Sequence, residues 1–114
     1  MKRRFRLRSS TEFKRVRQIG KSSAHPLLVL VASPTPDGLK IGVTAGRSVG
    51  SAVERNRAKR RLRAAIDQFM PRIPPGWNII LIARQPILKV SWPELLLALQ
   101  TLLKKARLLE EPEV

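Results

Sequence analysis

The stretch AVERNRAKRRLRAAIDQFM, residues 52 to 70, constrains the fold of this chain more than any other part of its sequence. At 100° per residue its apolar side chains fall within an arc of roughly 100°, which predicts a helix with one face on a core. They are Ala58, Leu62, Ala65, Ile66 and Phe69. Five lysines and arginines between residues 57 and 63, together with Asn56, fill about the next 200°, and Arg55 lies at the edge of the apolar stripe. We therefore expect a helix over 52–70, ended by Pro71, with a buried face and a wide basic face.

The basic face implies an anionic partner. Like charges one helical turn apart repel by a few tenths of a kcal/mol per pair, a cost that an anion lying against them offsets. The formal net charge is +15, and residues 1–63 carry seventeen Lys/Arg against three acids, whereas residues 64–114 carry six against five. This uneven distribution favours a polyanion such as nucleic acid over an acidic membrane or an acidic protein.

Hydrophobic periodicity predicts a single mixed α/β domain over residues 1–114. Ser9 and Glu12 have capping-box spacing at the start of a helix over 11–19, and Ser91 and Glu94 have it before a helix that runs to about 109. Strands are predicted at 27–33, 39–45 and 77–83. The order is α-β-β-α-β-α, with room for one more short strand, and we expect the basic arm 1–8 and the acidic tail 110–114 to be flexible.

The first two long strands are predicted to pair as a hairpin. Residues 27–33 form a continuous apolar run, as in a strand covered on both faces, and PTPDG at 34–38 is a turn sequence. Along 39–45 the residues Leu39, Ile41 and Val43 alternate with Lys40, Gly42 and Thr44. One face of this strand therefore meets a core, and the other is open to a polar ligand.

The side chains that hydrolytic enzymes use are not grouped in this sequence. There is no cysteine, and the single histidine, His25, precedes Pro26 at a strand entrance, where a structural role is the usual one. The carboxylates lie in separate elements without metal-ligand spacing, and GRSVGSA lacks the ending of a phosphate-binding loop. The residues favour binding over catalysis, with no protein metal site.

The sequence shows no targeting signal or membrane span. No apolar region of secretory length follows the basic N-terminus, and the longest apolar run, residues 27–32, is far too short to cross a bilayer. The absence of cysteine fits a reducing compartment, so we expect a cytoplasmic protein. No helix-turn-helix pattern precedes the basic helix, which argues against DNA as the partner.

Four segments together resemble the protein subunit of bacterial ribonuclease P. The segment AVERNRAKRRLR, 52–63, is similar to that family's signature helix, roughly A-V-x-R-N-x-x-K-R-x-x-R, at Ala52, Val53, Arg55, Asn56, Lys59, Arg60 and Arg63. Segments 6–16, 41–50 and 79–84 follow in the family's order, with Phe13, Gly42, Arg47 and Gly50 in their usual places. The resemblance covers about residues 3 to 105.

The resemblance implies a small α/β sandwich with a left-handed βαβ crossover and a role in tRNA maturation. In that family a catalytic RNA subunit removes the 5′ leader from precursor tRNA with Mg²⁺ that the RNA binds, and the protein supplies no catalytic residue. RNA-subunit contacts are carried over to Arg55, Asn56, Arg57, Lys59, Arg60, Arg61 and Arg63. Contacts with the single-stranded leader are carried over to Phe13, Arg17, Lys40, Thr44, Arg47 and Arg84.

The sequence departs from the family where it has fewer aromatic residues. Arg17 and Val31 stand where members often have an aromatic side chain, and the aromatic content is only 4%. Base stacking is therefore limited to Phe13, which by spacing could equally be a core partner of Val16, and arginines must supply other leader contacts. Two alternatives are a ribosomal-protein-like RNA scaffold, which would have no effect on tRNA 5′ processing, and a self-sufficient nuclease, which would cut RNA without an RNA partner.

Overall fold

The computed structural model of this chain describes residues 1–109, and the predicted acidic tail at 110–114 lies outside the described residues. The helices and strands are α1 (Ser10–Ile19), β1 (Lys21–Ala24), β2 (Leu28–Pro34), β3 (Leu39–Ala45), α2 (Ala52–Asp67), β4 (Trp77–Ala83) and α3 (Trp92–Lys105). Short 3-10 turns are η1 (Arg3–Phe5), η2 (Arg47–Val49), η3 (Met70–Arg72) and η4 (Gln85–Leu88). The predicted α/β class and element order are confirmed, and β1 is the additional short strand.

The predicted hairpin between the strands now labelled β2 and β3 is wrong. The sheet order is β1-β2-β4-β3, so β4 lies between these two strands, antiparallel to β2 and parallel to β3. β2 instead forms its hairpin with β1. Apolar side chains on both faces of β2 and β4 favour the two central positions of the sheet, where both faces are covered. The parallel strands β3 and β4 are therefore joined by a crossover through α2. The resemblance implied that this crossover is left-handed, and its handedness stays a prediction.

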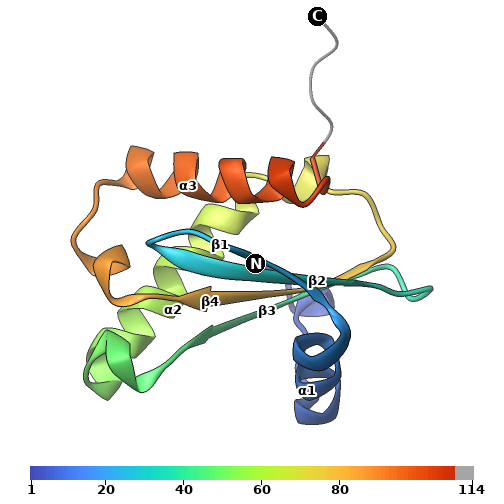
Figure 1. Cartoon of the computed structure of the whole chain (residues 1–114), viewed down its shortest axis with the longest axis horizontal. Helices are drawn as coiled ribbons and strands as arrows, with labels where there is room; N and C mark the ends of the chain where they lie inside the picture. The colour runs from blue at the N-terminus through green and yellow to red at the C-terminus, as the bar shows by residue number, and fades with distance from the viewer. Residues whose placement is uncertain (110–114) are drawn as a thin grey trace, which may run out of the picture.

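The sheet separates two layers of helices, as Figure 1 shows, with α1 on one face and α3 on the other. The larger core joins the buried sides of α2 and α3 to the inward residues of β2, β3 and β4, among them Leu30, Ile41 and Leu81. The smaller core joins Val16 of α1 to the opposite face of the same sheet. The central strands are therefore covered on both faces, as the apolar run in β2 predicted.

Both long helices end earlier than predicted. After α2 ends at Asp67, the amides of Gln68 and Phe69 bond three residues back, which tightens the last turn before Pro71. After α3 ends at Lys105, Arg107 takes a φ of 60°, and the Leu108 amide donates to the carbonyl of Leu103. This left-handed turn redirects the chain so that Leu108 is buried.

The N-terminal segment, predicted to be a flexible arm, makes specific contacts with the domain. Leu7 is buried, and its amide donates to the carbonyl of Ile41 at 3.0 Å, while Arg6 forms a parallel bridge to the same residue. The terminal ammonium of Met1 lies 2.6 Å from a carboxylate oxygen of Asp67. Residues 6 and 7 thus cover part of the open edge of β3. Among the described residues, no helix has the length and apolar content to cross a bilayer.

Candidate nucleic-acid interface

Helix α2 begins at a capping box that the prediction missed. The Ser51 hydroxyl accepts a hydrogen bond from the Glu54 amide at 3.3 Å, and the Glu54 carboxylate accepts one from the Ser51 amide at 3.1 Å. The hydrogen bond from the Ser51 amide lowers the pKa of the Glu54 carboxyl, helped by the Ser51 hydroxyl and by the charges of Arg57 and Lys89. The Ser-x-x-Glu spacing was the signal that could have located this helix start.

The predicted division of α2 into a buried and a basic face is confirmed. Every residue of the predicted apolar stripe is buried: Ala58, Leu62, Ala65, Ile66 and Phe69. The predicted RNA-subunit contacts occupy the rest of the surface. Asn56, Arg57 and Arg60 are exposed, and Arg55, Lys59, Arg61 and Arg63 are half-buried at the margins of the core.

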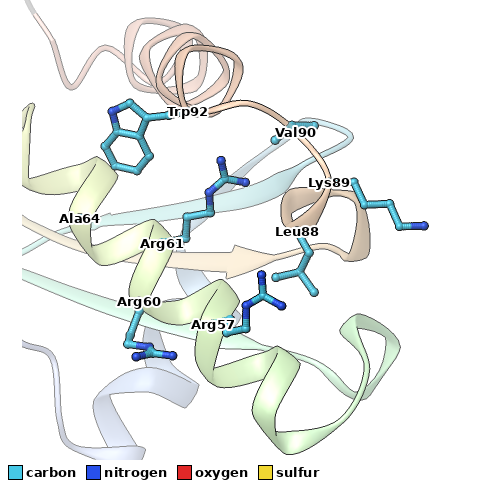
Figure 2. A pocket seen from close by; sticks show the side chains of 8 residues that line it. All are labelled: Arg57, Arg60, Arg61, Ala64, Leu88, Lys89, Val90 and Trp92. Carbon is cyan, nitrogen blue, oxygen red and sulfur yellow. The ribbon is translucent and has the colours of Figure 1, made fainter.

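The basic face of α2 has two flanks that meet different parts of the fold. On one flank Arg63 lines a pocket of about 180 Å³ together with Arg6 and Arg8 of the N-terminal segment. On the other flank, an open pocket of about 590 Å³ lies between α2 and the segment from η4 to the start of α3, as shown in Figure 2. We call it the Trp92 pocket, and its lining includes Arg57, Arg60, Arg61, Leu88, Lys89 and Trp92. Neither Lys89 nor Trp92 was among the predicted binding residues.

Arg61 has a structural contact that distinguishes it from its basic neighbours. Its guanidinium donates a hydrogen bond of 2.7 Å to the carbonyl of Ile87 in η4. Ile87 is fully buried, so this bond satisfies a carbonyl that water cannot easily reach. Arg61 therefore ties α2 to the segment that leads into α3.

The sheet face that carries α1 presents side chains in rows across neighbouring strands. In the middle row, Val31, Ile80 and Gly42 are aligned by the strand register. Val31 and Ile80 are buried with Val16 of α1, and the ring of Phe13 lies against Gly42. Helix α1 thus covers the middle row.

The next row, toward the carboxyl ends of β3 and β4, is not fully covered. It contains Val29, Ile82 and Thr44, which the register aligns across β2, β4 and β3, and all three are half-buried. We call these three residues the uncovered row. Periodicity within each strand assigns Ile82 and Thr44 to one face of their own strand. Only the sheet order shows that the two residues are neighbours.

Four of the predicted leader-binding residues belong to elements that adjoin the uncovered row. Phe13, Val29 and Ile82 all pack against the smaller core, and Phe13 is half-buried. Arg47 and Arg84 follow the parallel strands β3 and β4, so both lie at the same edge of the sheet. The Arg84 guanidinium donates to the carbonyl of His25 at 3.2 Å, which holds it beside the start of β2.

Arg17 lies on the flank of α1 that faces the uncovered row. Glu12 and Arg15 line a pocket with Ser33 and Asn78, on the other side of the middle row. At 100° per residue, Arg17 falls on the opposite flank of α1 from these two residues. Its side chain is exposed and one helical turn from Phe13.

One predicted leader-binding residue, Lys40, and the position of a missing aromatic residue, Val31, lie elsewhere. Lys40 shares a row with Ser33 and Asn78, and the row covered by α1 separates it from Thr44. Val31, placed by the sequence at an aromatic position of the leader face, is buried beneath α1. Alternation along one strand puts Lys40 and Thr44 on the same face, but it does not show where α1 crosses that face.

The carboxylates of the described residues do not converge. Among residues 1–109, no three His, Asp or Glu side chains gather in a way that could hold a metal ion. Glu12 and Asp37 line one pocket beside α1, whereas Glu54 is engaged in the cap of α2 and Asp67 contacts the terminal ammonium. Within the described residues, these carboxylates therefore do not form a ligand set for Mg²⁺.

Comparison with known proteins agrees with this geometry. The family model described as Ribonuclease P matches residues 1–107. The ribonuclease P protein component of Herpetosiphon aurantiacus is 40% identical over 99% of this chain and 93% of its own, and that of Geobacillus kaustophilus is 32% identical over 93% and 89%. A solved RNase P protein of Staphylococcus aureus matches with a TM-score of 0.81 and 27% identity over 93% of this chain and 98% of its own. That of Thermotoga maritima matches with a TM-score of 0.77 and 28% identity over 88% and 96%. The chain therefore belongs to the ribonuclease P protein family.

Proposed function

We propose that this chain docks on the RNA subunit of ribonuclease P through α2 and holds the 5′ leader of precursor tRNA along the uncovered row. Membership of the family makes the chain part of a tRNA-processing endoribonuclease with an RNA subunit as its partner. The division of labour between the two faces of the protein is the part that we propose.

The docking proposal is supported by the exposed cations of α2. Arginine forks suit pairs of phosphate oxygens, and Arg57 and Arg60 make no side-chain hydrogen bond or ion pair within residues 1–109. The buried stripe on the other side of the helix fixes these side chains relative to the domain. Such a surface binds structured RNA chiefly through its backbone.

The leader proposal depends on one observation: the uncovered row is only half-buried, and an aromatic ring and three arginines belong to the elements that adjoin it. Half-buried Val29 and Ile82 can contact bases, Phe13 can stack on one base, and Arg17, Arg47 and Arg84 can pair with phosphates. This combination holds a single strand without reading much sequence. It is unsuited to a duplex because the apolar row would meet only the charged backbone.

Catalysis is assigned to the RNA subunit, together with the Mg²⁺ of the reaction. The scattered carboxylates and the engaged roles of Glu54 and Asp67 support this assignment. The chain's own residues position two RNAs relative to each other and leave the hydrolytic chemistry to the RNA. The proposal includes precursor tRNA as substrate and includes neither DNA nor a membrane as partner.

Two single substitutions separate the two surfaces. Arg60→Ala should weaken binding of the RNA subunit and lower its salt slope by up to about one unit. Arg17→Ala should leave that binding unchanged, yet weaken binding of precursor tRNA by the assembled complex. Mature tRNA, which has no leader, is the matched ligand. If Arg17→Ala and Arg60→Ala had equal effects on the binding of precursor tRNA and of mature tRNA, the two-surface proposal would be refuted. Only general charge attraction would then remain.

A further inference from the structure

We infer that the Trp92 pocket binds one unpaired nucleotide of the RNA subunit, with the base against the Trp92 indole and the phosphates at Arg57 and Arg60. This inference rests on the proposed docking of α2 on RNA. It adds a nucleotide site to a surface that would otherwise bind only backbone charge.

Trp92 has an unusual position for a large apolar side chain. It is the first residue of α3, between the N-cap Ser91 and Pro93, and it is 36% exposed. Figure 2 shows its indole projecting from the start of α3 toward Ala64 of α2. The small side chain of Ala64 leaves space beside the ring instead of filling it. An indole that is neither buried nor fully solvated offers a flat apolar face for stacking.

The cations of the pocket line it from both α2 and the segment before α3. Figure 2 shows Arg57 and Arg60 on successive turns of α2, along the side of the pocket away from α3. Lys89 lines the pocket from the segment before α3, and Figure 2 shows its side chain extending outward, away from α2. Arg61 is already bonded to the carbonyl of Ile87, so it holds the two walls together and leaves the others to bind an anion.

The size of the pocket fits a small planar ligand with a charged tail. Its volume of about 590 Å³ lies within the range of roughly 300–1,000 Å³ that small-ligand sites occupy. An unpaired base on an aromatic ring, with arginines at its phosphates, is a recurring mode of RNA recognition. An acidic peptide would satisfy the cations but would leave the indole face without a planar partner.

Intrinsic fluorescence tests the inference directly because the chain has only two tryptophans, Trp77 and Trp92. In a Trp77→Phe variant, titration with the cognate RNA subunit should quench the remaining Trp92 emission. The matched Trp92→Phe variant, which reports only Trp77, should show no such quenching. Unchanged Trp92 emission at saturating RNA would overturn the inference, as would quenching by a polyglutamate peptide but not by RNA.

Affinity measurements separate stacking from packing. Trp92→Leu keeps an apolar side chain at the start of α3 but removes the aromatic face, so it should weaken RNA-subunit binding by about 5- to 100-fold. Trp92→Phe should retain most of the affinity. Thermal melting of both variants checks that α3 is intact.

Failure of this inference can be distinguished from failure of the proposed function. If Trp92→Leu binds the RNA subunit as tightly as the unmodified chain does, while Arg60→Ala binds it less tightly, the nucleotide site is refuted and the docking role stands. If the unmodified chain does not bind the RNA subunit, both are refuted.

Discussion

The ring of Phe13 lies so close to Gly42 that a Cβ atom at position 42 would overlap it. The two residues come from α1 and β3, and their contact allows the helix to cross the sheet at short range. Phe13 stays half-buried in this contact, and it packs against the same smaller core as Val29 and Ile82 of the uncovered row. Phe13 is therefore a packing residue whose remaining surface is available to a ligand.

Gly42→Ala should destabilise the domain. A methyl group at this position must displace the Phe13 ring, and overpacking of this kind costs about 1–3 kcal/mol of unfolding free energy. Gly46→Ala is the matched control, because a Cβ atom there would lie 3.9 Å from the Ser48 hydroxyl, its nearest neighbour. Urea unfolding of both variants measures the difference. Equal stabilities would show that Phe13 does not need the space above Gly42.

Phe13→Ala should weaken the assembled enzyme's binding of precursor tRNA with a leader of several nucleotides. Loss of one stacked base costs about 1–3 kcal/mol of binding free energy, so the dissociation constant should rise by the corresponding factor. Binding of mature tRNA should hardly change. Since Phe13 also packs against Gly42, thermal melting must accompany the measurement. If both tRNAs lose affinity equally in a folded variant, Phe13 serves only the core.

Arg61→Ala should lower stability, whereas Arg60→Ala should not. Removing the Arg61 guanidinium leaves the carbonyl of buried Ile87 without its partner, which costs about 1–3 kcal/mol. Arg60 is exposed and makes no such bond within residues 1–109. Chemical unfolding of the two variants compares a structural arginine with a binding one. A stability loss in both, or in neither, would contradict this distinction.

The capping box at Ser51 should make the stability of α2 depend on pH. The pKa of Glu54 is lowered from its ordinary value of 4.5, so its contribution is present above that value and is lost as pH falls through the lower folded pKa. Glu54→Gln should therefore be less stable than the unmodified chain at pH 7, and the difference should shrink on acidification below pH 4.5. Melting curves across this range test the sign. A difference that grows toward acid would mean that the charge of Glu54 opposes folding.

The elements of the fold could be predicted from local patterns, but their arrangement could not. The stripe on α2 and the bounds of β4 follow from periodicity within one segment, and both are confirmed. The order of strands depends on which apolar runs pair across the chain. The PTPDG turn suggested a hairpin, but its two strands flank β4, because two strands with both faces apolar take the centre of the sheet.

The candidate site was predictable as a list of residues and not as a surface. Phe13 and Arg17 come from α1, Arg47 from η2 and Arg84 from the residue after β4, and the family resemblance named them. That these elements adjoin the row of Val29 and Ile82, while Lys40 lies across the covered row, follows only from the position of α1 on the sheet. Trp92 was missed because its relation to α2 depends on the loop before α3, which has no periodic pattern.

The assignment of catalysis to the RNA subunit is tested most directly by cleavage of a precursor tRNA at low Mg²⁺ concentration. The RNA subunit, the purified chain and the two together are compared on the same substrate. We predict no cleavage by the chain alone at any Mg²⁺ concentration, slow cleavage by the RNA alone, and faster 5′-leader removal when the chain is added. Site-specific cleavage by nuclease-free protein, lost on substitution of an acidic residue such as Asp37, would contradict the assignment.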